Sequence, residues 1–300
     1  MRQAAHTMLE ARISDDYRSR MDTDDAVLDL LPSGHAARHD RAALASKRYS
    51  DLGFVGAMVE RQFGFAVSGP SPDMTHATSA RQHVQGGCEP YYAVMSGLLR
   101  QGTNSIAGDR PVAHVDVGTG VGRLVAESAS FGVQLGLGLD LFPEPLAYAH
   151  RIVVEDRRVE LPLRVTRCRQ TTVAIDGLGR SSVFFGVADA HELPLNDKSF
   201  ELVSCCNVLH RVSDPLGVLR EVQRVTAIGG FLLLSNSYDW DHEYSEQAQW
   251  FDDTLDLIRD TQDATWSVHT TVDPVPYMSR IFDRKYTYAL NEVLLLRRDR

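Results

Sequence analysis

The sequence predicts an α/β fold: a mostly parallel β-sheet with helices on both faces, an antiparallel pair of strands at its C-terminal edge, and a helical N-terminal extension. Three observations lead to this fold class. From residue 111 onward, short and almost wholly apolar runs alternate with segments of helical periodicity. A glycine-rich turn follows the first of these runs directly, and two further extended stretches end the chain. Fully apolar strands that alternate with helices are typical of a parallel sheet buried on both faces.

Residues 1–110 are expected to form a mostly helical extension that caps the substrate side of the main domain. Helical spacing of apolar residues predicts helices over 8–21 and within 42–67. Prolines and paired glycines predict a loop over 68–90. The pattern over 89–99 predicts a helix that leads into the main domain.

The main domain is expected over residues 111–300, where apolar periodicity predicts each element. The expected strands are 111–117, 133–139, 182–187, 200–206 and 231–234. The expected helices are 121–130, 143–156, 213–226, with Gly229-Gly230 as its cap, and 246–260. Two extended stretches, 265–272 and 285–296, are expected to form the antiparallel pair at the edge of the sheet.

The composition argues against several classes of function. The chain has 300 residues and a formal net charge of −9, without the basic footprint of a nucleic-acid-binding protein, so no nucleic-acid partner is expected. The sequence shows no apolar run of membrane-spanning length and no signal-peptide core, so we expect a cytoplasmic protein without a membrane partner. The four cysteines include no C-x-x-C pair, so no metal site is expected. The acidity weakly favours a small-molecule or protein substrate.

Residues 116–122, Asp-Val-Gly-Thr-Gly-Val-Gly, form a glycine-rich turn between a strand and a helix. Glycines permit the tight turn and let the backbone approach a ligand closely. The turn alone does not identify the ligand, because a nicotinamide-binding enzyme places a similar turn there. Two details argue against that alternative: Asp116 precedes the turn within the strand, and the turn is one residue shorter than the nicotinamide pattern. The pair Asp189-Ala190, which follows a later strand, is a third.

Four segments together resemble the class I S-adenosylmethionine-dependent methyltransferases: HVDVGTGVGRL, GLGLDL, GVADAHELPLNDKSFELVSCCNVLHRVSDP and LREVQRVTAIGGFLLLS. The resemblance covers residues 112–236. It implies a Rossmann-like sheet and S-adenosylmethionine as the cofactor, bound over the carboxyl ends of the strands 111–117, 133–139 and 182–187. Open α/β sheets place their ligands at this edge on physical grounds as well.

The resemblance also implies roles for individual residues. The turn packs under the methionine part of the cofactor, and Asp116 binds the turn or the amino group. Asp140 accepts hydrogen bonds from the ribose hydroxyls, a task that suits a carboxylate because it accepts at two oxygens. Asp189 accepts from the adenine amino group, whereas Arg123 either contacts a carboxylate or faces water. The expected cofactor-binding residues are Asp116, Gly118, Thr119, Gly120, Gly122, Arg123, Asp140, Leu141, Asp189, Ala190, Asn207 and Val208.

Two C-terminal segments, SNSYDWDHEYSEQAQWF and VPYMSRIFDRKYTYALNEVLLLRR, are similar to the methyltransferase domain of ovothiol synthases, which methylates a ring nitrogen of 5-thiohistidine. The similarity covers residues 140–298. The iron-binding region of those proteins has no counterpart here, and residues 1–110 do not match them clearly, so the acceptor need not be shared. The similarity nevertheless implies N-methylation of an imidazole ring, in histidine or a thiohistidine-like small molecule.

The acceptor side of the site is expected after the fourth and fifth strands. Aromatic faces can pack against an imidazole and stabilise a sulfonium, and a guanidinium fits a substrate carboxylate bidentately. A general base is needed only if the nucleophile carries a proton when it attacks. The expected catalytic residues are His210 and Tyr238, with His191 as a further candidate, and the expected substrate-binding residues are Trp240, Tyr244, Trp250 and Arg280.

Other functions stay open on the sequence alone. An O- or C-methyltransferase of a secondary metabolite and a non-catalytic cofactor-binding partner subunit would share this fold. A nicotinamide-dependent oxidoreductase is disfavoured by the length of the turn and by Asp189-Ala190. The sequence leaves open the methylated atom, the use of a general base and the oligomeric state.

Overall fold

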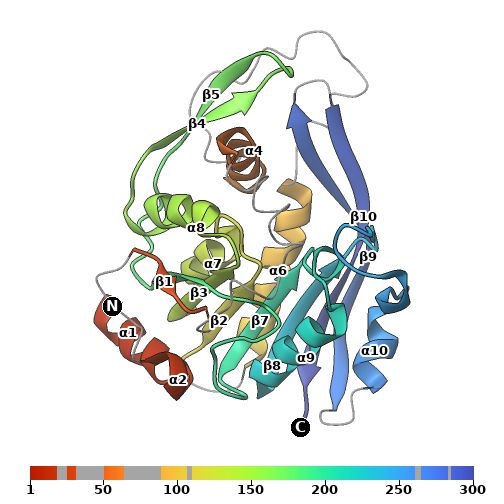
Figure 1. The fold of residues 1–300 in the computed structure, drawn as a ribbon. Coiled ribbons are helices and arrows are strands. Elements are labelled where there is room, and N and C mark those ends of the chain that lie inside the picture. Colours follow the sequence, from red (N-terminus) through yellow and green to blue (C-terminus); the bar gives the residue numbers. More distant parts are fainter. Residues whose placement is uncertain (19–25, 32–50, 64–88, 107–109, 261–264, 283–284) are drawn as a thin grey trace.

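The computed structural model of the chain describes residues 1–18, 26–31, 51–63, 89–106, 110–260, 265–282 and 285–300 (Figure 1). Within these residues, the centre of the fold is an eight-stranded sheet in the order β1-β6-β3-β2-β7-β8-β10-β9. The parallel strands are β1 Leu28–Asp29, β6 Val183–Val187, β3 Leu135–Asp140, β2 Ala113–Val117, β7 Phe200–Cys206 and β8 Thr226–Asn236. Strand β10 Lys285–Arg298 is antiparallel to both neighbours, β8 and β9 Trp266–Phe282. The expected mostly parallel sheet with an antiparallel C-terminal edge is confirmed.

Helices cover both faces of this sheet (Figure 1). One face packs against α1 Arg2–Glu10, α2 Asp15–Arg18, α9 Pro215–Val225 and α10 Thr254–Asp260. The other face packs against α6 Glu89–Ser105, α7 Arg123–Ser128 and α8 Pro143–Ala149, which continues as a π-helical turn over His150–Val154. Among the described helices, none has the length and apolar character needed to cross a membrane.

Strand β3 shows how the sequence sets these two layers. Side chains alternate along a strand, and the leucines of the Leu-Gly-Leu-Gly-Leu run join the core under α1 and α9. Gly136 faces α7, where an added Cβ would lie 3.4 Å from the carbonyl oxygen of Val125. An added Cβ on Gly138 would lie 2.7 Å from the ring of Phe185. The small residues of β3 therefore let the helix after the glycine turn pack directly on the sheet.

Two elements were not predicted from the sequence. Strand β1 comprises two residues and pairs with β6 at the edge of the sheet, too short to give a periodic signal. Strands β4 Val159–Arg164 and β5 Gln170–Ile175 form an antiparallel hairpin within the long segment 157–180. Strand β4 alternates buried with more exposed residues and β5 begins with exposed ones. Neither strand therefore resembles the continuous apolar runs of the central sheet.

Two expected helices differ from the structure, and a third lies where it was expected. The expected helix 8–21 is wrong as one element, because α1 ends at Glu10 and the buried Ile13 forms a β-bridge with Leu195 before α2 begins. The expected helix 246–260 is divided into a 3-10 turn, Gln247–Gln249, and α10, whose start is capped by Asp253 accepting the N–H groups of Leu255 and Asp256. The helix expected within 42–67 is α4 Leu52–Phe63. Residues 42–50 and 64–67, like most of the predicted loop 68–90, lie outside the described residues.

Gly229 and Gly230 lie within β8 and do not cap the preceding helix. The end of α9 is closed in another way. The hydroxyl of Thr226 donates to the carbonyl of Val222, and the carbonyl of Arg224 accepts the N–H of Lys198. The last carbonyls of the helix thus find partners without a glycine cap.

Three segments far apart in the sequence meet above the carboxyl ends of the strands. Helix α4 lies between the β4–β5 hairpin and the far end of the β9–β10 pair (Figure 1). Arg280 on β9 joins them, because its Nη1 donates to Glu60 on α4 at 2.7 Å and its Nη2 donates to the carbonyl of Arg164 on β4 at 3.4 Å. We call these three segments the roof.

Gly56 on α4 is a position where close packing outweighs helix propensity. An added Cβ there would lie 2.2 Å from the carbonyl oxygen of Pro162, a backbone atom that cannot rotate away. We predict that Gly56→Ala lowers the free energy of unfolding by more than about 1 kcal/mol. The matched control is Gly97→Ala on α6, where an added Cβ meets no atom within 4 Å. That control should stabilise the protein by about 0.5–1 kcal/mol. Chemical denaturation measures both, and equal effects would contradict the packing argument.

Candidate functional site

The path of the chain through the sheet reverses between β2 and β7. From β2 the chain adds β3 and then β6 on one side, whereas β7 and β8 follow on the other side. In an open α/β sheet, the crevice at the carboxyl ends of the strands beside such a reversal is the expected ligand site.

Two cavities meet at this crevice. The first, here the β6-side cavity, has a volume of about 180 Å³ and is lined by the loops that follow β3, β6 and β7. The second, the α4-side cavity, has a volume of about 110 Å³ and lies between the glycine turn and helices α4 and α6. Gly118, Asp140 and Asn207 line both cavities. The two cavities therefore form one groove across the ends of β2, β3 and β7.

The glycine turn is fixed to the end of β3. Gly118 and Gly120 have φ angles of 75° and 59°, a region that residues with a Cβ rarely adopt. The N–H groups of Gly118 and Thr119 donate to the carbonyl of Leu139 at 2.8 and 2.9 Å, and the N–H of Gly120 donates to Oδ2 of Asp140 at 2.9 Å. These three N–H groups are used within the protein. The turn thus offers a ligand a close approach to the backbone, and any charge on the ligand needs partners elsewhere.

Asp140 ends β3 and stands between the two cavities. Its Oδ2 accepts from Gly120, and its Oδ1 accepts from the N–H of Phe142 at 3.1 Å. Burial raises the pKa of this carboxyl, while the backbone N–H groups oppose the shift. Both oxygens are thereby held in one orientation at the wall of the groove, beside Leu141. This arrangement suits a carboxylate that accepts from a pair of neighbouring hydroxyls.

Asp189 and His191 line the β6-side cavity together with Ala190. Oδ1 of Asp189 accepts the backbone N–H of His191 at 2.9 Å and lies 2.7 Å from Nδ1 of the same histidine. Nε2 of His191 accepts the backbone N–H of Asp214 at 3.2 Å. Because Nε2 acts as an acceptor, Nδ1 carries the proton and donates to Asp189. His191 therefore orients a carboxylate in the cavity wall.

Asp116 is buried beneath the turn and lines the α4-side cavity. The hydroxyl of Ser204 donates to its Oδ1 at 2.5 Å, and the same hydroxyl lies 2.8 Å from Nε2 of His114, whose Nδ1 lies 2.8 Å from Ser128. Burial raises the pKa of Asp116 to about 6 and lowers that of His114 to about 3. His114 is therefore neutral, and Asp116 changes charge close to neutral pH.

Asn207 follows β7 directly and lines both cavities. Its φ angle is 58°, its Nδ2 donates to the hydroxyl of Tyr91 at 3.1 Å, and that hydroxyl donates to Ser235 at 3.0 Å. Its Oδ1 is buried and has no hydrogen-bond partner among the described residues. A buried acceptor without a partner costs about 1–3 kcal/mol. This oxygen is thus suited to a donor that a ligand brings.

Gly122 and Arg123 are placed behind the turn and line neither cavity. An added Cβ on Gly122 would lie 2.6 Å from the ring of Phe185, so this glycine serves packing. The buried Arg123 donates to the carbonyl of Gln62 and to the carboxylate of Glu127. It does not face water, and the carboxylate that it contacts belongs to its own helix.

The two predicted catalytic residues lie outside the groove. The buried His210 donates from Nδ1 to Oδ1 of Asn236 at 3.0 Å, and burial lowers its pKa to about 4. The hydroxyl of Tyr238 bonds to Thr254 and to Glu292, and burial raises its pKa. Neither side chain lines the β6-side or the α4-side cavity. Both stabilise contacts between β8 and the segments around it.

The predicted substrate-binding residues are also dispersed. Trp240 and Trp250 stack on each other with ring centroids 6.4 Å apart, and their indole N–H groups donate to the carbonyl of Phe251 and the hydroxyl of Ser245. Arg280 is paired with Glu60 in the roof. Tyr244 lines the β6-side cavity, whereas the other three line neither cavity of the groove. The aromatic cluster after β8 is therefore mostly packing.

The α4-side cavity is lined by side chains that the sequence analysis did not select. The apolar spacing of α4 predicted a helix, and the sequence contains no pattern that ties its last turn to the glycine turn. These side chains are Met58, Arg61 and Gln62 on α4, Tyr91 and Tyr92 on α6, and Tyr277 on the edge strand β9. An added Cβ on Gly120 would lie 2.9 Å from Nε2 of Gln62, so the glycine permits this close approach of α4.

Residues 115–234 match the protein family described as methyltransferase domain. No curated protein sequence matches the chain. Three solved structures have a similar fold. Magnesium protoporphyrin IX methyltransferase from Synechocystis PCC 6803, with bound S-adenosylmethionine, is 16% identical, with a TM-score of 0.48 over 86% of this chain and 98% of that chain. An S-adenosylmethionine-dependent methyltransferase from Aquifex aeolicus is 16% identical, with a TM-score of 0.41 over 69% and 89%. Phosphoethanolamine N-methyltransferase 2 from Haemonchus contortus is 17% identical, with a TM-score of 0.44 over 77% and 46%.

The match of residues 115–234 to a methyltransferase domain supports an enzyme. The Rossmann-like sheet predicted from the sequence is confirmed, and S-adenosylmethionine is the cofactor that the sequence resemblance implies. The residues of the groove fit this cofactor. The β6-side and α4-side cavities meet at Gly118, where an added Cβ would lie 2.2 Å from Val208. The rigidly held carboxylate of Asp140 stands between these two cavities.

Asp140 provides the first test of the groove. We predict that Asp140→Asn weakens binding of S-adenosylhomocysteine by about 10- to 150-fold, because charge-assisted hydrogen bonds to the ribose are worth about 1.5–3 kcal/mol. Asparagine keeps one oxygen for the backbone N–H of Gly120, which limits damage to the turn. Titration calorimetry measures the affinity, and Asp189→Asn should weaken it less. Wild-type affinity in the Asp140 variant would contradict the assignment.

Asp116 predicts how cofactor binding depends on pH. The cofactor carries positive charge, so it prefers the ionised carboxylate, and the pKa of about 6 means that acid removes that form. Affinity should rise with pH up to about 6 and then level off, with a loss of up to about tenfold per pH unit below that value. Calorimetry between about pH 5 and pH 8 tests this, with Asp116→Asn as the control that abolishes the slope. The same slope in the control would assign the effect to another group.

Proposed function

We propose that this enzyme transfers a methyl group from S-adenosylmethionine to a ring nitrogen of a small imidazole compound, such as histidine or a thiohistidine. The observation that carries the proposal is Oδ1 of Asn207, a buried acceptor without a partner among the described residues, at the junction of the two cavities. A neutral imidazole has one N–H and one lone pair. An N–H donated to Asn207 would fix the tautomer and leave the other nitrogen to attack.

The cofactor lies across the whole groove in this proposal. Its adenosine part occupies the β6-side cavity, where Asp140 accepts from the ribose and Asp189 accepts from the adenine amino group. Its methionine part occupies the α4-side cavity, with the amino group toward Asp116. When bound, S-adenosylmethionine supplies an electrophilic methyl group on a sulfonium.

The aromatic side chains that support an imidazole acceptor come from α6 and β9. The rings of Tyr91 and Tyr277 meet edge to face with centroids 4.9 Å apart, and Tyr92 packs against Tyr91 at 5.2 Å. All three line the α4-side cavity. Aromatic faces attract a cationic centre by about 0.5–2 kcal/mol, and they also exclude water from a flat ring. These tyrosines take the role that the sequence analysis expected of Trp240 and Trp250.

A general base is not required for this reaction. A free imidazole has a pKa of about 6.5, so most of it is neutral at pH 7 and attacks through its lone pair. Asn207 would hold the N–H of the ring while the new N–C bond forms and the methyl–sulfur bond breaks. S-adenosylhomocysteine would leave, and the methylated ring would lose its N–H proton to solvent. The positions of His210 and Tyr238 outside the groove are compatible with such a mechanism.

Mass spectrometry with a panel of acceptors tests the proposal. Histidine or a thiohistidine should gain one methyl group, whereas phenols and carboxylic acids should stay unchanged. Asn207→Gly tolerates the positive φ angle and removes the acceptor oxygen, and it should lower kcat/KM by about 5- to 100-fold. Asn207→Asp keeps an oxygen at the same place and should lose much less. Methylation of a phenol with no reaction on imidazoles would leave the methyltransferase standing and overturn the imidazole proposal.

A further inference from the structure

We propose that a third cavity, separate from the groove, binds a small organic anion that carries a phosphate or carboxylate group beside an apolar part. This cavity, here the rear cavity, has a volume of about 340 Å³, within the range of about 300–1,000 Å³ that is common for small-molecule sites. It lies between the end of α4, helices α6 and α7, and the segment before β6. Among the described residues, none lines both this cavity and the groove.

Two arginines give the rear cavity its positive charge. Arg100 comes from α6 and Arg180 precedes β6, and neither forms an ion pair within the part of the chain that the structure describes. The guanidinium carbon of Arg100 lies 5.0 Å from the centre of the Phe131 ring, a neutral neighbour. The carboxylate that lines the cavity, Glu127, is already paired with Arg123. The charges of the two arginines thus stay available to a ligand.

Two buried polar atoms in the wall of the rear cavity lack hydrogen-bond partners. They are Nε of Arg180 and the hydroxyl oxygen of Ser96 on α6, and neither forms a hydrogen bond with a described residue. A buried donor without a partner is costly, because it has lost its bond to water and gained none in return. Both groups can donate, and both line the same cavity. A ligand with several acceptor oxygens would satisfy them together.

An oxyanion is the group that these donors favour. A guanidinium presents five N–H donors in a planar fork, which matches the oxygens of a carboxylate or a phosphate. The chain as a whole is acidic, with 40 acidic against 31 basic residues, so arginines without acidic partners are not a general property of its surface. Other arginines face carboxylates, as Arg12 does with Glu201 and Arg224 with Asp197.

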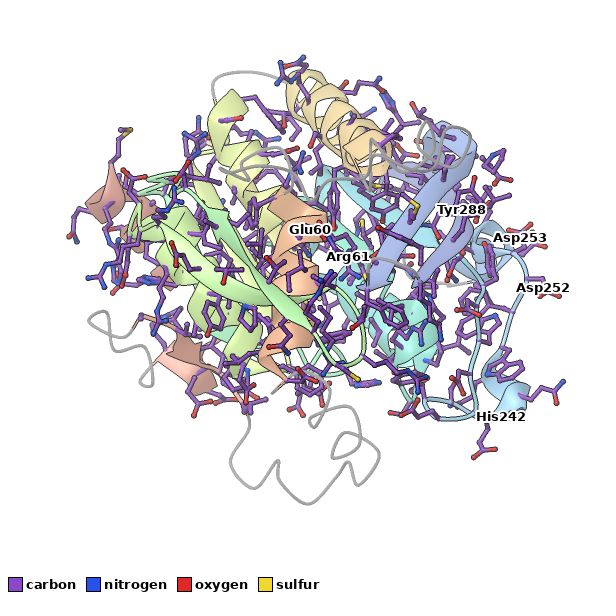
Figure 2. All side chains as sticks on the ribbon, turned by 90° about the horizontal axis from the view of Figure 1, so that it is seen from above. Glu60, Arg61, His242, Asp252, Asp253 and Tyr288 are labelled. Atoms are coloured by element: carbon purple, nitrogen blue, oxygen red, sulfur yellow. The ribbon has the colours of Figure 1, made fainter. Side chains whose placement is uncertain are left out.

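The roof shows the contrast with the rear cavity. Figure 2 shows Glu60 and Arg61 next to each other on the side of α4 that faces β9 and β10. Glu60 forms its ion pair with Arg280, and Arg61 donates to the hydroxyl of Ser279. The rear cavity instead includes Phe63, at the end of the same helix. The charged residues of α4 thus serve the roof, whereas the arginines of the rear cavity come from other elements.

An apolar wall determines the other part of the ligand. Phe63, Ala126, Phe131 and Leu178 line the cavity beside the donors. Small-molecule sites commonly combine such apolar walls with a few polar groups that fix the orientation of the ligand. Inorganic phosphate alone would leave the apolar wall without a contact. A compound with an aromatic ring and one anionic group would contact the wall and the donors at once.

The experiment is a calorimetric titration of the full-length protein with phenyl phosphate, benzoate and benzyl alcohol. Phenyl phosphate and benzoate should bind, less tightly at high salt, whereas the neutral alcohol should not. The tighter of the two anions identifies the preferred group. Arg180→Met should weaken binding of the preferred anion by about 10- to 100-fold. The matched control is Arg151→Met, an exposed arginine that also packs on an aromatic ring, that of Tyr148, and lies outside the rear cavity. It should bind the anion like wild type.

Ser96→Ala separates ligand binding from structure. Loss of a buried hydroxyl without a partner should not lower the free energy of unfolding, whereas it should weaken binding of the anion by about 2- to 10-fold. Chemical denaturation checks the first expectation and calorimetry the second. If Arg180→Met does not fold, Arg100→Met on the exposed side chain decides the question, and it should weaken binding by at least about fivefold.

Each other outcome overturns the inference. Failure of the wild-type protein to bind either anion at millimolar concentration would mean that the rear cavity is not an anion site. Equal binding of benzyl alcohol would reduce it to an apolar hollow, and equal weakening by Arg151→Met would assign the effect to the charge of the whole protein. Displacement of the anion by S-adenosylhomocysteine would place the anion in the groove. None of these results bears on the methyl acceptor proposed above.

Discussion

The attachment of the glycine turn to the end of β3 is the constraint on which the site depends. Two N–H groups of the turn share the carbonyl of Leu139, and a third donates to Asp140. The carboxylate that faces the groove is thereby also the anchor of the turn. This double use fixes Gly118 at the junction of the two cavities and aligns the ends of β2 and β3. Because positive φ angles are needed at Gly118 and Gly120, glycine is required at both positions.

The central sheet could be predicted from the sequence because its signals are local. Each buried parallel strand is a nearly continuous apolar run, and the turn and the acidic residues follow such runs directly. The elements that were missed lack this local signal. Strand β1 is two residues long, and the β4–β5 hairpin is only partly buried, with alternating or exposed residues. The division of the helix expected over 246–260 depends on the cap at Asp253, which competes with the helical periodicity.

The same difference between residues with and without a local sequence signal separates the β6-side cavity from the α4-side cavity. Asp140 and Asp189 could be placed because each ends or follows a strand whose direction the sheet dictates. The position of Arg280 could not be predicted, since it follows from a contact between α4 and β9, which are more than 200 residues apart in the chain: the pair of Glu60 and Arg280. The prediction gave Arg280 the task of binding a carboxylate, and the fold instead pairs it with Glu60.

The buried carboxylates of the groove connect its stability to its ligand. Burial makes the ionised form of Asp116 costly in the free protein, and this cost raises its pKa to about 6. Each pKa unit corresponds to about 1.4 kcal/mol. Between the unfolded value near 4 and the folded value near 6, the native state binds more protons than the unfolded state, so this residue makes the protein less stable as pH rises through that range. At pH values above that range, a bound positive charge lowers the free-energy cost of ionising Asp116. The same buried acid therefore weakens the empty fold at neutral pH and favours a cationic ligand over a neutral one of the same shape.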